Sequence, residues 1–122
     1  MRSGIEDAEK QRGCQPEDPQ LEPGQFAAAW ELLADEAHWT AIKHGWWRAE
    51  RNDGELIALM YSDLGKAFAE LWKGEDRDDA RLAGYLADCI IRIMDYAVVR
   101  GLCVGDAIER KVSGEERWPG LI

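Results

Sequence analysis

Four stretches of the chain place apolar residues every three or four positions, which is the spacing that gathers them on one face of an α-helix. These stretches cover residues 25–43, 54–73, 80–100 and 104–112. No segment reads convincingly as a β-strand. The pattern therefore predicts an all-α protein, a bundle of about four helices joined by short connections.

The spacing also predicts which side chains form the core. The third stretch is apolar over much of its circumference, which is more than one small domain needs to bury. Because a large exposed apolar surface would be a liability, we expect a second subunit to cover part of it, giving a homodimer or a dimer of dimers. The expected core residues are Phe26, Trp30, Leu33, Ala37 and Ala41 in the first helix, Leu56, Met60, Leu64, Ala67, Phe68 and Leu71 in the second, and Leu82, Leu86, Cys89, Ile90, Ile93, Met94, Ala97 and Val98 in the third.

Short polar residues and glycine mark the expected ends of these helices. Asn52 or Asp53 can cap the second helix by accepting a backbone N–H bond, and Asp78 or Asp79 can cap the third. Gly101 is placed to end the third helix, because glycine adopts the left-handed conformation at low cost.

Length and charge limit the classes of function. A chain of 122 residues with 46% hydrophobic residues is one domain with a modest core. Its net charge of −9 argues against binding to nucleic-acid polymers or anionic membranes, which requires clustered Lys and Arg. No apolar run is long enough to span a bilayer, and no signal-type segment follows Met1. The three cysteines lack CxxC spacing and fit a reduced, cytoplasmic compartment.

The first 24 residues differ in composition from the rest of the chain. They contain three of the four prolines, and three Lys/Arg against six Asp/Glu give them a charge of −3. We expect residues 1–24 to be a flexible tail and residues 25–122 to be the helical domain.

A paired tryptophan stands immediately before the second predicted helix, followed by an Arg-Asn-Asp-Gly turn. An aromatic surface beside polar turn groups and a helix N-terminus would suit a nucleobase and its phosphates. Trp47 is the expected base-stacking residue, although tryptophans also serve as core anchors. Arg51 and Asn52 are expected to contact phosphate or base edges, and Asn52 has the alternative of simple turn or cap chemistry.

Residues 45–71, together with the run Leu-Ala-Asp-Cys-Ile-Ile-Arg-Ile-Met-Asp-Tyr-Ala at 86–97, resemble the MazG-like all-α nucleoside triphosphate pyrophosphohydrolases. Residues 101–108 and the basic pair Arg110-Lys111 also resemble that family's closing helix, so the resemblance covers about residues 39–119. It implies a helical bundle, usually assembled from dimers. It also implies cleavage of NTPs or dNTPs between the α and β phosphates, which releases a monophosphate and pyrophosphate.

The resemblance further implies Mg²⁺ held by Glu-x-x-Glu on one helix and Glu-x-x-Asp on the next, since residues three apart share a helix face. The matching positions here read Asp63 to Lys66 and Tyr85 to Asp88. Asp63 and Asp88 are the remnant metal ligands, whereas Lys66 and Tyr85 replace two carboxylates. Glu70 is a further candidate ligand about two turns along. We expect the Lys66 ammonium to take the place of the metal, paired with Asp63 and Asp88.

Near the C-terminus, the family's pattern of a Lys, an Asn and an Arg-Pro is only partly matched. The chain offers Lys111, no corresponding Asn, and Arg117 before Trp118-Pro119. Lys111 and Arg117 are candidate phosphate contacts, although cations near a helix C-terminus also interact favourably with the helix dipole.

Three functions remain open from the sequence. The first is a MazG-like nucleotide-binding protein whose catalysis is weakened or lost. The second is an active nucleotide pyrophosphohydrolase that uses Mg²⁺ in a rearranged carboxylate site made of Asp63, Asp88, Glu70 and Asp95. The third is a helical interaction module without a ligand, which would require no cofactor.

Overall fold

The structure is a computed structural model, and it describes residues 21–120. Helix α2 spans Gln25–Lys43, α3 spans Asp53–Leu71, α4 spans Asp79–Arg100 and α5 spans Val104–Ser113, with the short 3₁₀ helix η1 at Gly74–Asp76. No strand occurs in this range, so the all-α prediction is confirmed for it. The largest difference from the predicted bounds is at the C-terminal end of α3, which ends at Leu71 rather than at residue 73. Most of the predicted tail, up to residue 20, lies outside the described residues.

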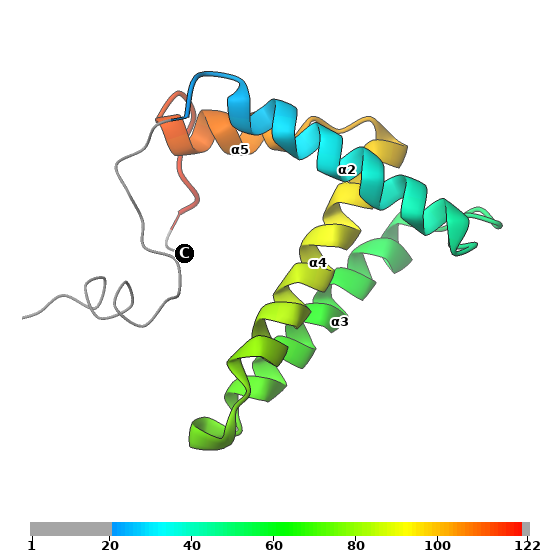
Figure 1. The fold of residues 1–122 in the computed structure, drawn as a ribbon, viewed down its shortest axis with the longest axis vertical. Helices are drawn as coiled ribbons and strands as arrows, with labels where there is room; N and C mark the ends of the chain where they lie inside the picture. Colours follow the sequence, from blue (N-terminus) through cyan, green and yellow to red (C-terminus); the bar gives the residue numbers. More distant parts are fainter. Residues whose placement is uncertain (1–20, 121–122) are drawn as a thin grey trace, which may run out of the picture.

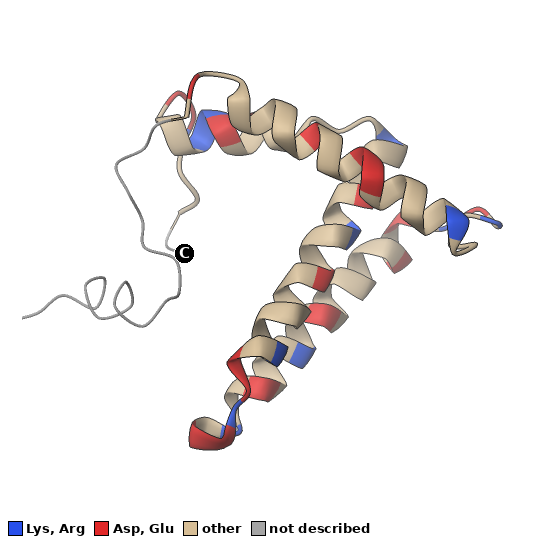
Figure 2. Cartoon of the chain, viewed as in Figure 1, with Lys and Arg blue, Asp and Glu red and all other residues tan. Residues whose placement is uncertain are grey.

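The helices form two arms that meet at one end of α4. Helices α3 and α4 make an antiparallel hairpin, and α2 crosses the C-terminal end of α4 with α5 beside it (Figure 1). Between residues 21 and 120, no helix is long and apolar enough to cross a membrane. Acidic and basic residues are mixed along both helices of the hairpin (Figure 2). The candidate site described below lies where the two arms join.

The helix ends follow local side-chain chemistry. Asn52 caps α3, since its side-chain oxygen accepts a hydrogen bond from the Glu55 N–H at 3.2 Å. Asp78 caps α4 in the same way by accepting from the Arg81 N–H at 3.1 Å. Gly101 ends α4 at a φ of 67°, a left-handed conformation that favours glycine. The cap and stop positions expected from the sequence are therefore confirmed.

Close contact between Trp30 and Gly105 sets how α2 and α5 pack. A Cβ atom added at Gly105 would lie 2.9 Å from two ring carbons of Trp30 and 3.0 Å from its Cβ. Only a residue without a side chain therefore lets the Trp30 ring lie directly against the α5 backbone. This contact holds the short α5 beside α2.

The buried core is small and only partly matches the expected one. It consists of Ala34, Leu56, Met60, Ala67, Cys89, Met94 and Ala97. Six other expected core residues are 43–60% exposed, and these predictions are wrong for the single chain. For the three that lie on α3, the reason is that α3 packs mainly against α4 among the described helices, and α4 covers only one side of it. The exposed residues are Leu33, Leu64, Phe68, Leu71, Leu86 and Ile90.

Candidate functional site

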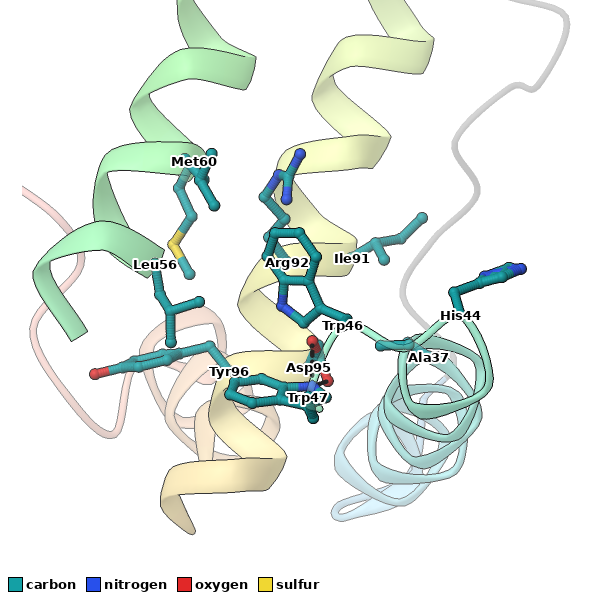
Figure 3. A pocket seen from close by; sticks show the side chains of 12 residues that line it. Ala37, His44, Trp46, Trp47, Leu56, Met60, Ile91, Arg92, Asp95 and Tyr96 are labelled. Atoms are coloured by element: carbon teal, nitrogen blue, oxygen red, sulfur yellow. Dashed lines mark hydrogen bonds between the residues drawn. The ribbon is translucent and has the colours of Figure 1, made fainter. Parts of the chain in front are cut away.

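A cavity of about 190 Å³ lies between α2, α3, α4 and the turn that follows α2 (Figure 3). Its walls are mainly aromatic and aliphatic, with Arg92, Asp95 and His44 as the polar contributors. It is smaller than the roughly 300–1,000 Å³ of typical small-molecule pockets, so it suits a flat ring better than a large ligand. The lining residues are Ala37, Ala41, His44, Trp46, Trp47, Leu56, Leu59, Met60, Ile91, Arg92, Asp95 and Tyr96.

A buried carboxylate on α4 fixes one aromatic wall of this cavity. Asp95 is 6% exposed, and both of its oxygens accept from the Trp47 indole N–H at 3.0 Å. Nδ1 of His38, from α2, lies 2.7 Å from Asp95 Oδ1. The Trp47 indole is thereby held in one orientation against α4, with its ring edge-on to His38 at a centroid distance of 6.1 Å. A ring held this way is pre-organised to form a wall.

The guanidinium groups of Arg51 and Arg92 lie close to the ring of the neighbouring Trp46. Cζ of Arg51 lies 3.6 Å from the centroid of the Trp46 ring, and Cζ of Arg92 lies 5.5 Å from it. Both distances are within the range of cation–π attraction. Arg51 also donates from Nε to the Trp46 carbonyl at 2.7 Å and from Nη1 to Glu55 at 3.1 Å. Arg51 therefore braces the turn, while Arg92 lines the cavity itself.

The shortest ion pair of the hairpin lies next to the cavity. Asp63 on α3 is 1% exposed, and Arg92 Nε donates to its Oδ2 at 2.5 Å. A buried carboxylate is costly unless it is paired, so Arg92 supplies the charge that Asp63 requires. The pKa of the neighbouring Cys89 thiol is raised, first by burial and then by the negative charge of Asp63. This thiol is consequently held in its neutral, unreactive form.

Glu70 is also buried, but it serves the connection between α3 and α4. It is 2% exposed and accepts from Lys73 Nζ and from the Asp78 backbone N–H, each at 3.0 Å. The Asp78 N–H bond and then the Lys73 ammonium hold the Glu70 pKa below its ordinary value. Glu70 therefore ties the tip of the hairpin together.

The expected pairing of Lys66 is wrong. Lys66 and Asp88 are both exposed, and Lys66 forms no ion pair with either Asp63 or Asp88. The cation that reaches Asp63 is Arg92, which comes from the facing helix rather than from the same helix. Tyr85 is half-buried.

The carboxylates present do not fit the Mg²⁺ site that the family resemblance implies. Asp63 is bound to Arg92, Glu70 is bound at the hairpin tip, and Asp88 is exposed. Within the described part of the chain, no three or more His, Cys, Asp or Glu side chains are grouped to hold a metal ion. A divalent ion needs several convergent, unpaired oxygen ligands, which this arrangement does not provide.

The structure brings together some of the residues expected to bind a nucleotide and leaves others apart. Trp47 lines the cavity, whereas Asn52 is the cap of α3. Lys111 Nζ donates to the Arg117 carbonyl at 3.2 Å, and both residues belong to the α5 end of the molecule, away from the turn that carries Trp47 (Figure 1). The contact between His38 and Asp95 was not expected, because no spacing rule links residues 57 positions apart in the sequence.

Comparison of the chain with protein-family models, with curated proteins and with solved structures found no match.

Proposed function

We propose that this chain is a MazG-like protein that binds a nucleotide through its aromatic cavity and whose pyrophosphohydrolase activity is weakened or lost. The observation that carries the proposal is the pairing of Asp63 with Arg92 beside a cavity walled by tryptophan. The position expected to hold a metal ligand is occupied by an internal ion pair, while an aromatic wall is retained.

The chemistry of the cavity supports a planar aromatic ligand. Trp46, Trp47 and Tyr96 contribute aromatic faces or edges, and a ring stacked on such a surface gains about 1–3 kcal/mol. The volume of about 190 Å³ suits a base rather than a whole nucleotide. Under this proposal the base occupies the cavity. The sugar and phosphates lie towards its mouth, where the Arg92 guanidinium supplies positive charge.

The charges along α3 and α4 support weakened catalysis. In the implied reaction, four converging carboxylates hold the metal ions that polarise the phosphates. Here one remnant ligand already has a cationic partner, and Lys66 places a second positive charge on α3. A metal ion would have to displace Arg92 and leave its guanidinium beside the site, which opposes binding by direct repulsion.

A titration of the full chain with a panel of NTPs and dNTPs tests this proposal. Binding is followed by intrinsic tryptophan fluorescence and by calorimetry, and pyrophosphate release is assayed in parallel with Mg²⁺ or Mn²⁺. We expect saturable binding with no metal-dependent release. Release that requires a metal would favour the active-enzyme alternative, and an absence of binding would favour the interaction module.

A matched pair of variants tests whether the nucleotide binds in the cavity. Trp47→Phe removes the indole that Asp95 holds, and we expect it to weaken nucleotide binding about tenfold. Trp39→Phe is the control, because Trp39 is 58% exposed on α2 and is not part of the cavity wall. Equal affinities for the two variants would exclude the cavity as the binding site.

A further inference from the structure

Arg92 connects the aromatic cavity to the ion pair of the hairpin. Its Nε donates to Oδ2 of Asp63 at 2.5 Å, and Asp63 is 1% exposed. Within residues 21–120, neither Nη group of Arg92 donates a hydrogen bond to a protein acceptor. Figure 3 shows the Arg92 side chain between α3 and α4, beside the ring of Trp46. The guanidinium is therefore anchored through Nε, while its two Nη donors stay available.

The surroundings of Arg92 hold this pair of donors in place and leave it accessible. The buried Asp63 fixes one edge of the guanidinium, and the centroid of the Trp46 ring lies 5.5 Å from Cζ. The Arg92 side chain is nevertheless 32% exposed and lines the cavity. A planar pair of N–H donors matches the oxygens of a phosphate, and a group already held in position loses little freedom when it binds one.

A base in the cavity would bring one particular phosphate to Arg92. In a nucleotide, only the sugar separates the base from its first phosphate, and any further phosphates lie beyond the first. Because Arg92 belongs to the wall of the cavity itself, the first phosphate is the one that its Nη groups can reach. The geometry therefore provides for one phosphate group.

The charge of the site also limits how many phosphates it can accommodate. The Asp63 carboxylate balances the positive charge of Arg92, and the buried Asp95 adds a negative charge to the cavity. A protonated His38 would do no more than balance Asp95, with which it is paired. The site consequently offers fixed hydrogen-bond donors without a net positive charge.

The neighbouring arginines do not make up this deficit. Arg51 donates to Glu55 at 3.1 Å, and Arg100 donates to Asp53 at 2.6 Å, so each already has a carboxylate partner. Arg48 is exposed and lies outside the cavity wall. Among the residues that line the cavity, Arg92 is the one Lys or Arg.

We propose that the cavity takes a nucleoside monophosphate in preference to a triphosphate, that the two Nη groups of Arg92 bind its single phosphate, and that no divalent cation is required. A phosphate monoester carries about two negative charges near neutral pH, and each further phosphate adds charge that this site does not balance. The inference rests on the proposed nucleotide binding and specifies the form of the nucleotide.

Calorimetric titration of the full chain tests the preference, using the nucleoside, the 5′-monophosphate and the 5′-triphosphate of each common base. In EDTA we expect the monophosphate to bind about tenfold more tightly than either of the others, and equally tightly when Mg²⁺ replaces EDTA. A triphosphate that binds as tightly as the monophosphate would overturn the inference. So would equal affinities for nucleoside and monophosphate, or monophosphate binding that requires Mg²⁺.

These outcomes separate the inference from the proposed function on which it rests. In each of the three contradicting cases a ligand still binds, so nucleotide binding would stand and only the preference for a metal-free monophosphate would fall. No binding of any nucleoside, monophosphate or triphosphate would overturn both.

Arg92→Lys tests the assigned phosphate contact. It keeps a positive charge for Asp63 but removes the planar pair of donors. We expect the Kd of the monophosphate to rise about tenfold while that of the nucleoside stays unchanged, a difference that damage to the cavity would not produce. Arg48→Lys is the matched control at an exposed position in the turn after α2, and should change neither Kd. Equal monophosphate affinities for the two variants would overturn the assignment.

A second variant keeps the test decisive if Arg92→Lys does not fold. Asp63→Asn retains an oxygen that can accept from Arg92 Nε and removes the charge that balances the guanidinium. The site then gains net positive charge, so we expect the affinity for the triphosphate to increase at least about threefold more than that for the monophosphate. An unchanged ratio of the two affinities would overturn the inference.

Discussion

Both regions of the molecule bury carboxylates, but they differ in where their apolar side chains lie. Where α2 crosses α4, the carboxylate of Asp95 is surrounded by His38 and Trp47 from other segments, and apolar residues line a cavity next to it. Along the free length of the hairpin, Asp63 and Glu70 are buried while Tyr61 and Phe68 face outwards. The comparison shows that a buried ion pair joins the two helices of the hairpin, while large apolar side chains of α3 stay exposed in the single chain.

The largest loss of stability is expected when the ion pair between Asp63 and Arg92 is broken. Arg92→Met leaves the carboxylate of Asp63 buried without its partner, and we expect a loss of about 3 kcal/mol in the free energy of unfolding. Urea denaturation measures it. Adding Asp63→Leu should recover much of the loss, because replacing both partners removes the unpaired charge. Arg81→Met is the control, since Arg81 is 54% exposed and 3.9 Å from Glu70. Equal losses for Arg92→Met and Arg81→Met would contradict the account.

Removing the Asp95 carboxylate, where α2 crosses α4, tests whether it holds the Trp47 wall of the cavity. Asp95→Ala leaves the Trp47 indole N–H and His38 without their buried acceptor, which should cost about 2 kcal/mol of stability. The freed Trp47 should also shift its fluorescence emission to longer wavelength as it becomes more solvated. Asp88→Ala, at an exposed position on the same helix, should change neither quantity. An unchanged emission spectrum in Asp95→Ala would show that other contacts hold Trp47.

A smaller effect is expected where α5 lies against α2. Gly105→Ala places a methyl group 2.9 Å from ring carbons of Trp30, and we expect a loss of about 1–2 kcal/mol, measured by thermal unfolding. Gly84→Ala is the matched substitution inside α4, where the added atom meets nothing within 4 Å. It should instead stabilise the helix by about 0.5–1 kcal/mol. A loss of stability in Gly105→Ala together with a gain in Gly84→Ala would support the close packing of Trp30. Stability changes of the same sign would refute it.

The smallest expected effect concerns pH. Because the pKa of Glu70 is lowered in the folded protein, its contribution to stability is fully present above the ordinary carboxyl pKa. That contribution is lost as pH falls through the lowered pKa. Unfolding free energies measured from neutral pH into the acidic range should therefore fall less steeply in Glu70→Gln than in the wild type. Glu75→Gln, at an exposed position in η1, should keep the wild-type slope.

The sequence predicts the helices and their ends well, because those depend on neighbouring residues. Asn52, Asp78 and Gly101 act where local capping and turn chemistry place them. The exposed apolar face of α3 was not predicted, since periodicity identifies an apolar stripe but not which helix covers it. The excess apolar surface was expected mainly on the third predicted helix, yet the most exposed aromatic residues of the hairpin, Tyr61 and Trp72, belong to the α3 side.

The site was harder to predict than the fold, because its key contacts join distant parts of the chain. Arg92 pairs with Asp63 from 29 positions away, and His38 meets Asp95 across 57 positions. The role expected for Lys66 rested on its spacing from Asp63 within one helix. It missed Arg92, a cation on the facing helix that pairs with Asp63 instead. Trp47 lines the cavity together with Trp46, and its role in stacking a base stays a prediction.

The most direct measurement of the central claim is a calorimetric titration of the full chain with nucleotides, combined with a pyrophosphate assay on the same samples. The account predicts saturable binding of at least one nucleotide, weakened by Trp47→Phe, with no metal-dependent release of pyrophosphate. Turnover with Mg²⁺ or Mn²⁺ that is lost in Asp63→Asn would contradict it, because Asp63 would then serve catalysis rather than the ion pair with Arg92.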